Sequence, residues 1–535
     1  MNVGSGIPSE GALRRLASSG QAQRRSEEPS LTRRDFLGAL AVPILAPALV
    51  GLTRKSPRAI AGGFVDDGGA LGHRLRDGAV VPATGAERRV PVVIVGGGVA
   101  GLSAGWELRR RGMSDFVILE LESAVGGNAR SGENDVTAYP WAAHYVPVPG
   151  AGSVLVRELF EELGVLHDGS WEERYLCFSP QERVFSHGEW HDGIEPEFAL
   201  DAAGRAAFKQ FDEEIARHRA SGEFTIPMAA GVRRESPLDR LSMADWLKQH
   251  RLDAPALGWY VDYACRDDYG ALAAHTSAWA GIHYFASRAH DEQGPLTWPE
   301  GNGWIVKRLA AQLAPHIHTG EPAVRVERAG NRWRVRTAIA TYLTDSDIFA
   351  APTFLLPYIV PELASHRSSL IYSPWLTANI TLDRPPRERG HGAPLSWDNV
   401  IYESPALGYV DATHQSLRTR ADRSVWTYYW SLADISPADG RKKLASVAWH
   451  DCIDAILRDL EQPHPDIRDC VSRIDVMRMG HAMVRPSVGF LADTTAAENI
   501  GIPGLILANS DLSGLSLFEE AQFRGVMAAR KVLRR

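Results

Sequence analysis

The stretch from Val90 to Arg130 constrains the fold more than any other region of this 535-residue chain. It opens with the apolar run Val92 to Val95, which has no polar alternation and therefore predicts a strand covered on both faces, as in a parallel sheet. The motif G-x-G-x-x-G follows at once, at Gly96, Gly98 and Gly101, where this strand should turn into a helix. The first glycine permits the tight turn, the second lets a diphosphate approach the backbone, and the third lets the helix lie close to the sheet.

A helix, a second strand and an acidic residue follow at the spacing of a dinucleotide-binding unit. Residues Leu102 to Arg111 predict the helix, Phe116 to Leu119 the next strand, and Glu120 ends that strand. An acidic side chain about 20 residues after the glycines accepts a hydrogen bond from a ribose hydroxyl. The alternative is a structural glycine turn in another kind of α/β unit. Further contacts are expected from the helix N-terminus, whose N–H groups face the phosphates, and from the residue after the acid; these are Val99, Ala100 and Leu121.

A second glycine cluster directly after Glu120 gives the pattern a resemblance to a known group. It contains Gly126, Gly127, Asn128 and Arg130, where the glycines allow close backbone approach and the arginine adds a fixed charge. The series GGGVAGL, E and GGxxR resembles the flavin-containing amine oxidase superfamily, which includes polyamine oxidases, spermidine dehydrogenase, protoporphyrinogen oxidase and phytoene desaturases. The resemblance implies non-covalently bound FAD rather than NAD. It also implies an α/β fold, in which a Rossmann-type FAD-binding domain is assembled from non-contiguous segments beside an α+β substrate domain.

Two later motifs extend the resemblance. After a P-x-G-N-like turn at residues 298–304, a hairpin around Gly330 is similar to the strands that contact adenine in the superfamily, which makes Ala323 and Val324 candidates for that contact. The closing segment, residues 504–530, resembles the strand and helix that complete the FAD site. Asp511, in place of the usual glutamate, is expected at the ribityl or phosphate region, with Ser516 and Leu517 at the turn into the last helix.

These motifs predict a domain order. The chain is expected to begin with a twin-arginine signal peptide and a disordered extension (1–61), followed by a tether (62–89). Three segments should then form the FAD-binding domain, at residues 90–152, 295–350 and 476–535. A helical substrate-domain insertion (153–294) and a substrate-domain sheet (351–475) should separate these three segments.

The first 61 residues resemble an export signal. Arg33 and Arg34 precede an uncharged apolar run at 36–53, and Ala59-Ile60-Ala61 reads as a cleavage site. A periplasmic or exported protein that uses the twin-arginine machinery is therefore expected. The alternative is a membrane anchor formed by residues 36–53, which is short for a span and contains two prolines. Without residues 1–61 the chain has 49 Lys/Arg and 61 Asp/Glu, a net charge of −12.

The composition excludes some partners and leaves the cysteines ambiguous. Hydrophobic residues make up 44% and charged residues 23%, as in a soluble enzyme, and no basic stripe interleaved with aromatics predicts nucleic-acid binding. The four cysteines lack metal-like spacing, so no metal site is expected. Buried free thiols are one interpretation, and a bridge between Cys452 and Cys470 in an oxidising compartment is the other.

Candidate substrate-binding residues lie in several later stretches. The strand 425–432 places Trp426, Tyr428 and Trp430 on one face, which is suited to a cationic or flat ligand, although packing of a half-buried sheet gives the same pattern. His414 and His481 are candidate bases or water-holding groups. Other candidates are the loop residues His144 and Tyr145, and the adjacent carboxylates Asp267 and Asp268, for which loop packing and a solvated helix end are the alternatives.

The expected activity is oxidation of an amine by hydride transfer to flavin N5, and a polyamine-like substrate is one form of this hypothesis. Chemistry of this kind needs the neutral amine, and a dry aromatic pocket disfavours the ammonium form. No lysine lies between Lys307 and Lys442, where many superfamily oxidases hold a lysine that positions water, so an unknown electron acceptor other than oxygen is favoured. The alternatives are a desaturase-like enzyme for an apolar polyene or ring, and a non-catalytic partner protein with a flavin fold.

Overall fold

The computed structural model describes residues 59–65, 68–231, 236–288, 294–366, 368–416 and 422–534. The predicted export signal therefore lies outside the described residues, except for its last three positions. Among the described helices, none combines the length and the apolar character needed to cross a membrane.

A five-stranded parallel sheet forms the centre of the nucleotide-binding domain. Its strand order is β13-β4-β3-β17-β23, and every neighbouring pair is parallel. The strands are β13 (Ile317–His318), β4 (Phe116–Leu119), β3 (Val92–Val95), β17 (Ser346–Phe349) and β23 (Leu505–Leu507). Since they come from widely separated regions of the chain, the predicted assembly from non-contiguous segments is confirmed.

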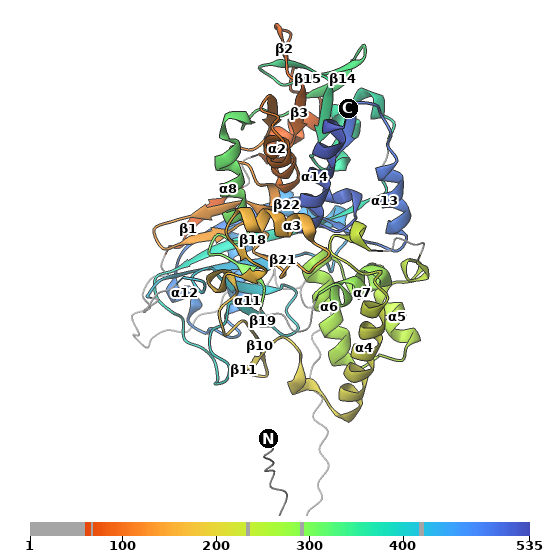
Figure 1. Cartoon of the computed structure of the whole chain (residues 1–535). Coiled ribbons are helices and arrows are strands. Elements are labelled where there is room, and N and C mark those ends of the chain that lie inside the picture. The colour runs from red at the N-terminus through yellow and green to blue at the C-terminus, as the bar shows by residue number, and fades with distance from the viewer. Residues whose placement is uncertain are drawn as a thin grey trace, which may run out of the picture. The chain divides into compact units, whose positions relative to one another are not determined.

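Helices cover one face of this sheet and a small, mostly antiparallel sheet covers the other. One face packs against α2 (Val99–Arg110), α8 (Gly303–Leu313), α14 (Phe518–Leu533) and α3 (Val154–Glu162). Figure 1 shows α2 and α14 lying side by side, and the two helices are in extensive contact. The other face packs against a sheet with the order β14-β15-β16-β2. Its strands are β14 (Arg325–Ala329), β15 (Arg332–Arg336), β16 (Thr341–Thr344) and β2 (Glu87–Arg89).

The second domain is built on an eight-stranded mixed sheet of order β1-β22-β18-β21-β20-β19-β10-β11. The strands are β1 (Ala61–Phe64), β22 (Val471–Arg485), β18 (Ile371–Leu382), β21 (Ser424–Trp430), β20 (Gly408–Asp411), β19 (Asp398–Ile401), β10 (Glu182–Ser186) and β11 (Glu189–Asp192). One face packs against α10 (Pro437–Ser446), α11 (Trp449–Leu460) and α12 (Ile467–Cys470).

A helical unit adjoins this sheet. It contains α4 (Ala202–Ala220), α5 (Met243–Gln249), α6 (Pro255–Tyr269) and α7 (Ala278–Ala286), which form the yellow-green region in Figure 1, together with the start of the blue helix α13 (Phe490–Glu498). Ser242, in the capping-box pattern Ser242 to Asp245, caps the start of α5, because its side chain accepts a hydrogen bond from the Asp245 N–H at 3.1 Å. The remaining elements are α1 (Gly69–Arg76), α9 (Leu356–Ile359), β5 (Ser131–Glu133), β6 (Ala138–Pro140), β7 (Tyr145–Val146), β8 (Leu166–His167), β9 (Ser170–Trp171) and β12 (Leu296–Thr297).

Two details differ from the sequence-based expectations. Residues 62–89 are not simply an irregular tether, because β1 pairs with β22 of the large sheet and α1 and β2 follow it. Residues 153–294 are not purely helical, since β10 and β11 extend the same sheet.

The cysteines follow the first of their two interpretations, buried free thiols. Cys452 and Cys470 are free and buried, and the Cys470 thiol donates to the Asp466 carbonyl at 3.2 Å.

Candidate functional site

The first glycine motif forms an open cradle at the carboxyl end of β3. Gly96 has a φ of +105°, which a glycine adopts without strain, and Gly98 is the N-cap of α2. No side chain caps this helix, so its first N–H groups are available to a ligand. A Cβ at Gly98 would meet no atom within 4 Å, whereas one at Gly101 would lie 1.9 Å from the Gly96 carbonyl oxygen. The middle glycine therefore borders free space, and the third allows α2 to approach the strand.

Glu120 closes one side of this cradle. It lies directly after β4, is 8% exposed, and accepts hydrogen bonds from the Gly97 N–H at 2.7 Å and the Glu122 N–H at 2.9 Å. Burial raises the pKa of the Glu120 carboxyl, against the effect of these two bonds. Leu121, next to it, is half-buried. A carboxylate held in this position beside the glycine loop has the geometry needed to accept from a ribose hydroxyl.

The second glycine cluster lies directly against the first. The Gly126 N–H donates to the Gly97 carbonyl at 2.8 Å, and a Cβ on Gly127 would lie 3.5 Å from the Gly98 Cα. Asn128 donates from Nδ2 to the Ala482 carbonyl at 2.5 Å, which ties the cluster to β22. Arg130 pairs with Glu122 at 3.4 Å, so its charge stays at the edge of the same crevice.

The candidate adenine-side residues are also near Glu120. The Gly320 N–H donates to the Glu122 carbonyl and the Glu321 N–H to the Glu120 carbonyl, each at 2.8 Å. Ala323 is buried and Val324 half-buried a few residues further on, immediately before β14. The structure thus brings this segment beside the predicted ribose position.

The closing segment completes the same crevice. Gly525 of α14 lies so close to the first turn of α2 that an added Cβ would be 2.1 Å from the Ala100 carbonyl oxygen. Ser516 accepts a hydrogen bond from the Val484 N–H at 3.0 Å, and Leu517 is the N-cap of α14 with no side-chain cap bond. These contacts bring the two ends of the nucleotide-binding domain together around β22.

Asp511 is buried in a hydrogen-bond network. Its carboxylate accepts from the Thr353 N–H at 2.7 Å, the Thr353 hydroxyl at 2.9 Å and the Tyr372 hydroxyl at 2.6 Å. Burial raises the pKa of Asp511, and these donors oppose the rise. The carboxylate therefore links the turn after β17 to the start of β18, and its predicted contact with the cofactor stays a prediction.

These residues together fit a dinucleotide cofactor. The cradle has room at Gly98, an uncapped helix start faces that room, and a buried carboxylate stands beside it. Uncapped N–H groups suit a diphosphate, and the carboxylate suits a ribose. The chemistry of the donor set therefore agrees with the FAD expected from the sequence.

The predicted aromatic face of β21 is on the wrong side of the strand. Trp426 and Tyr428 are 1% exposed and pack in the core under α10 to α12; Trp426 stacks on Tyr409 at 4.1 Å, and Tyr428 donates to Asp459 of α11 at 2.8 Å. Trp430 packs against the same core and lies under the Lys443 ammonium at 5.2 Å. The packing alternative describes these three residues, because side chains alternate along a strand and the even positions face the helices.

The two candidate histidines differ in position. His414 contacts the Phe178 carbonyl through Nε2 at 2.9 Å and so anchors a loop. His481 of β22 stacks on Phe354 at 4.5 Å, one residue from the Ala482 carbonyl that binds Asn128. Burial, followed by the charge of Arg441, lowers the pKa of His481 to about 4, which makes it neutral at physiological pH. Of the two, only His481 is near the crevice.

An aromatic cluster, consisting of His144, Tyr145, Trp397 and Tyr429, lies beside the second glycine motif. Its ring centroids are separated by 4.8 Å (His144–Tyr429), 5.0 Å (His144–Tyr145) and 5.4 Å (His144–Trp397). The loop that carries His144 is bound to the cradle, since the Ala143 N–H donates to the Asn128 carbonyl at 2.9 Å. Burial lowers the pKa of His144 to about 4, so the ring is neutral.

Sequence reasoning singled out the loop residues of this cluster and missed the two from the sheet. Tyr429 is the neighbour of the predicted Tyr428 and faces the opposite way, and its hydroxyl donates to the Ala142 carbonyl at 3.0 Å. The strand pattern was visible, but aromatic residues occupy both of its faces. Trp397 lies just before the short strand β19 and belongs to no motif in the sequence.

Carboxylates lie near the aromatic cluster. Asp268 is paired with Arg288 at 2.7 Å, while Asp267 has no hydrogen bond or ion pair with any other residue that the structure describes. Burial, followed by the charge of Asp268, raises the pKa of Asp267 to about 7. Burial raises the pKa of Tyr145 and Tyr429, and the charge of Asp267 adds to this rise in both. The charge of Asp398 also raises the pKa of Tyr429.

Comparisons with known proteins agree with this architecture. Residues 94–163 match the NAD(P)-binding Rossmann-like domain family. A solved putrescine oxidase bound to putrescine superimposes with a TM-score of 0.63 at 18% identity, over 84% of this chain and 100% of that one. The chain has the fold of this amine oxidase. The cyclohexylamine oxidase of Brevibacterium oxydans gives a TM-score of 0.62 at 14% identity, over 83% of this chain and 100% of that one.

A relative by sequence is the L-amino acid dehydrogenase of a Synechocystis species, which is 24% identical over 288 residues. The match covers 49% of this chain and 56% of the relative, so the chain spans little more than half of that protein's length. The resemblance to amine oxidases predicted from the glycine motifs is thus confirmed for the fold. At identities of 24% or less, the comparisons establish the fold, and the substrate follows from the residues of the site.

Proposed function

We propose that the protein is a FAD-dependent oxidoreductase that binds FAD non-covalently and oxidises an amine. The observation that carries the proposal is the loop before β7. Its backbone binds Asn128 of the cradle, and its His144 ring meets Trp397 and Tyr429 of the large sheet. One loop therefore joins the candidate cofactor crevice to an aromatic wall.

A bound flavin supplies the acceptor for the hydride that leaves the carbon next to the amine nitrogen. The aromatic cluster orients the amine and restricts water, and its neutral His144 adds no positive charge that would repel the substrate. Burial raises the pKa of the Asp267 and Asp398 carboxyls, so they become charged when an ammonium group enters beside them, and the desolvating rings then favour the neutral form of the amine. Both features suit an amine better than an apolar polyene.

The cofactor proposal is tested on the purified protein. We expect a yellow protein that releases its flavin into the supernatant when it is denatured by acid. Flavin that remains in the pellet contradicts non-covalent binding, and a colourless protein that takes up no added FAD favours the non-catalytic partner.

The substrate proposal is tested by anaerobic reduction of the bound flavin. We expect primary amines to bleach its absorbance and polyenes to leave it unchanged, and the reverse result supports the desaturase alternative. Reoxidation by oxygen, compared with reoxidation by a quinone or a dye, then identifies the class of electron acceptor. No lysine occupies the span between Lys307 and Lys442, and this supports an acceptor other than oxygen.

We also propose export by the twin-arginine machinery, supported by Arg33 and Arg34 and the apolar run after them. Fractionation of a bacterial host tests it. The wild type should appear in the periplasm, and the double variant Arg33→Lys, Arg34→Lys should stay in the cytoplasm. Wild-type protein of full length in the membrane fraction supports the anchor instead.

A further inference from the structure

A group of buried polar side chains lies where the large sheet meets the end of α6. Its centre is Ser373, near the start of β18, whose hydroxyl donates to the Gly270 carbonyl at 2.7 Å. A Cβ added at Gly270 would lie 2.3 Å from the Ser373 Oγ and 2.5 Å from the Trp375 Nε1, so these two groups are adjacent. The Arg485 guanidinium of β22 donates to the Ser373 Oγ at 3.4 Å, and the Ser431 carbonyl oxygen, just after β21, lies 3.4 Å from the same Oγ.

Three donors in this group lack an acceptor. The Arg485 Nε, the Trp375 Nε1 and the Ser431 Oγ are buried, and none of them has a hydrogen-bond partner among the described residues. We call these three side chains the donor cluster. Buried polar groups are paired in the great majority of cases, because an unpaired one costs the free energy of its desolvation. The missing acceptor is therefore expected to come from outside the chain.

Arg485 indicates that this acceptor is an anion. It is 5% exposed, and within the described part of the chain its guanidinium makes only the long bond to Ser373 and no ion pair. Burial, followed by the charge of Arg441, lowers the pKa of Arg485 to about 10, and the exposed Asp434 opposes this effect. The guanidinium thus stays charged at physiological pH. A buried positive charge near a second one is costly unless an anion binds to it.

The donor cluster lies on the same face of the large sheet as the aromatic cluster. Thr377 of β18 pairs with Tyr429 of β21, and side chains alternate along a strand, so Ser373 and Trp375 share the face of Thr377. Trp375 and Tyr429 also belong to one buried apolar cluster. The Thr377 hydroxyl is a further buried donor without a partner among the described residues. A row of unpartnered polar groups therefore leads from Arg485 to the aromatic cluster.

The spacing along β18 sets the length of a ligand that joins the two clusters. Ser373 and Thr377 are four residues apart, which corresponds to about 13 Å at about 3.3 Å per residue. Side chains at the two ends shorten this span by a few ångströms. A carboxylate on the same carbon as the amine is too close to it to occupy both places. A carboxylate separated from the amine by about five or more carbon atoms has the necessary length.

We propose that the donor cluster binds the carboxylate of an amino acid whose amine nitrogen is held at the aromatic cluster, with about five or more carbon atoms between the two groups. This inference rests on the proposed function and narrows its substrate class to amines with a distant anionic end. Arg485 would pair with the carboxylate, while Trp375 and Ser431 donate to its oxygens. All three would be specificity residues, because they contact the end of the substrate that does not react.

The test compares amines with and without a carboxylate on the FAD-loaded protein. Anaerobic flavin reduction is measured with 4-aminobutanoate, 6-aminohexanoate and 8-aminooctanoate, each beside the alkylamine of the same length, and with norleucine. We expect at least tenfold tighter apparent binding of 6-aminohexanoate or 8-aminooctanoate than of the matching alkylamine. Arg485→Gln should weaken binding of the best amino acid by about tenfold or more, with the values for the alkylamine nearly unchanged.

Two further variants separate binding from folding. Ser431→Ala removes a hydroxyl without a partner, so it should keep the melting temperature and still weaken binding of the amino acid by about threefold. Lys442→Gln is the matched control, since it removes one positive charge from the exposed side of α10 and should leave every ligand unaffected. Tightest binding of norleucine, equal loss for amino acid and alkylamine in Arg485→Gln, or no loss in Ser431→Ala overturns the inference.

A binding measurement separates this inference from the proposed function. The melting temperature is measured with hexanoate and with hexanamide, which has a similar shape without the charge, and no turnover is needed. A rise with hexanoate alone, lost in Arg485→Gln but kept in Lys442→Gln, supports the carboxylate site even if no amine reduces the flavin. If alkylamines reduce the flavin and hexanoate stabilises the wild type and Arg485→Gln equally, the proposed function stands and the inference falls.

Discussion

At the scale of single residues, Gly98 and Gly101 have different reasons to be glycine. Gly98 has a φ of −71° and borders open space, so an alanine there strains neither backbone nor packing. At Gly101 a methyl group would lie 1.9 Å from the Gly96 carbonyl oxygen, which belongs to the backbone and cannot move aside easily. Gly98 is therefore required by the ligand, and Gly101 is required by the fold.

We expect Gly98→Ala to keep the wild-type melting temperature of the flavin-free protein and to lose most of its affinity for FAD. Gly101→Ala should instead destabilise the flavin-free protein itself by about 2 kcal/mol or more, since overpacking forces a backbone shift. Chemical denaturation and fluorescence titration with FAD measure the two effects. Tight FAD binding by Gly98→Ala would contradict a diphosphate at this position.

Asp347 of β17 is a second residue whose environment predicts a measurable effect. It is fully buried, and neither carboxylate oxygen has a hydrogen-bond partner among the described residues. Burial alone raises the pKa of Asp347 to about 8. The folded state thus binds a proton that the unfolded state releases near its ordinary pKa of about 4. Stability from this group is present at low pH and is lost as the pH rises through 8.

Asp347→Asn removes this dependence. Between pH 5 and pH 8 the wild type should lose roughly 3.5 to 4 kcal/mol more unfolding free energy than the variant, at about 1.36 kcal/mol for each pH unit between the unfolded and folded pKa. The variant should therefore gain most over the wild type at alkaline pH. Urea denaturation of both proteins across this range measures the difference, and parallel curves would mean that Asp347 is ionised in the folded protein.

At the scale of elements, β21 separates a structural face from a functional one. Tyr428 points to α11, where its hydroxyl donates to Asp459, and Tyr429 points to the loop that carries His144. We expect Tyr428→Phe to cost about 1 to 2 kcal/mol of stability, because Asp459 loses a buried donor, with flavin reduction by amines unchanged. Tyr429→Ala should slow flavin reduction by about tenfold or more. Equal kinetic effects of the two variants would place both faces of the strand at the site.

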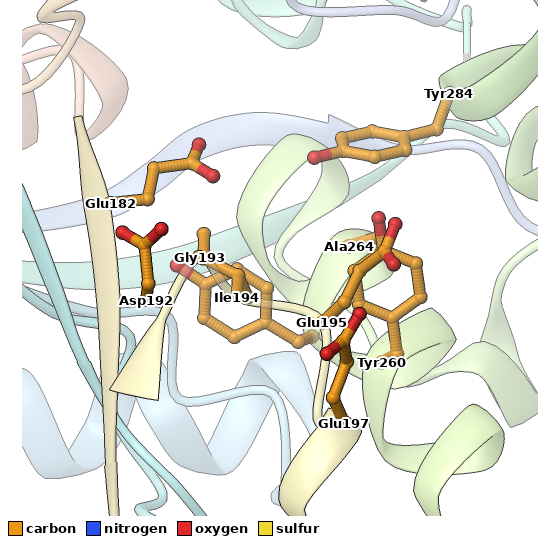
Figure 2. A pocket seen from close by; sticks show the side chains of 10 residues that line it. Glu182, Asp192, Gly193, Ile194, Glu195, Glu197, Tyr260, Ala264 and Tyr284 are labelled. Carbon is orange, nitrogen blue, oxygen red and sulfur yellow. The ribbon is translucent and has the colours of Figure 1, made fainter. Parts of the chain in front are cut away.

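The same strand shows how far the sequence alone leads. The glycine motifs, Glu120 and the Ser242 cap were predictable because each depends on neighbours within about 25 residues. Strand β21 was predictable as well, but its inward face was not, since aromatic residues alternate on both sides and both sides are covered. A surface hollow is lined by both Glu182 of β10 and Tyr284 of α7 (Figure 2), and no local sequence pattern predicts that residues so far apart in the chain line one hollow.

At the scale of the whole described chain, the eight-stranded sheet depends on the segment that follows the predicted signal. Strand β1 pairs with β22 in parallel register, from Ala61 opposite Arg473 to Phe64 opposite Val476. The Val65 N–H continues the ladder to the Val476 carbonyl at 3.0 Å, and the Arg478 guanidinium lies 3.8 Å from the centre of the Phe64 ring. Strand β22 in turn binds Asn128 and Ser516 near the cofactor crevice.

Chains that begin at different points should therefore differ in stability and in flavin retention. A chain that begins at Gly62, as after cleavage behind Ala61, keeps most of β1 and should match one that begins at Ala59. A chain that begins at Gly68 lacks the strand, exposes the edge of β22, and should lose about 1 to 2 kcal/mol of unfolding free energy. Because β22 also borders the crevice, the shortest chain should release flavin faster as well. Urea denaturation and flavin release on dilution measure both effects, and a shortest chain as stable as the other two would show that β1 adds nothing to the sheet.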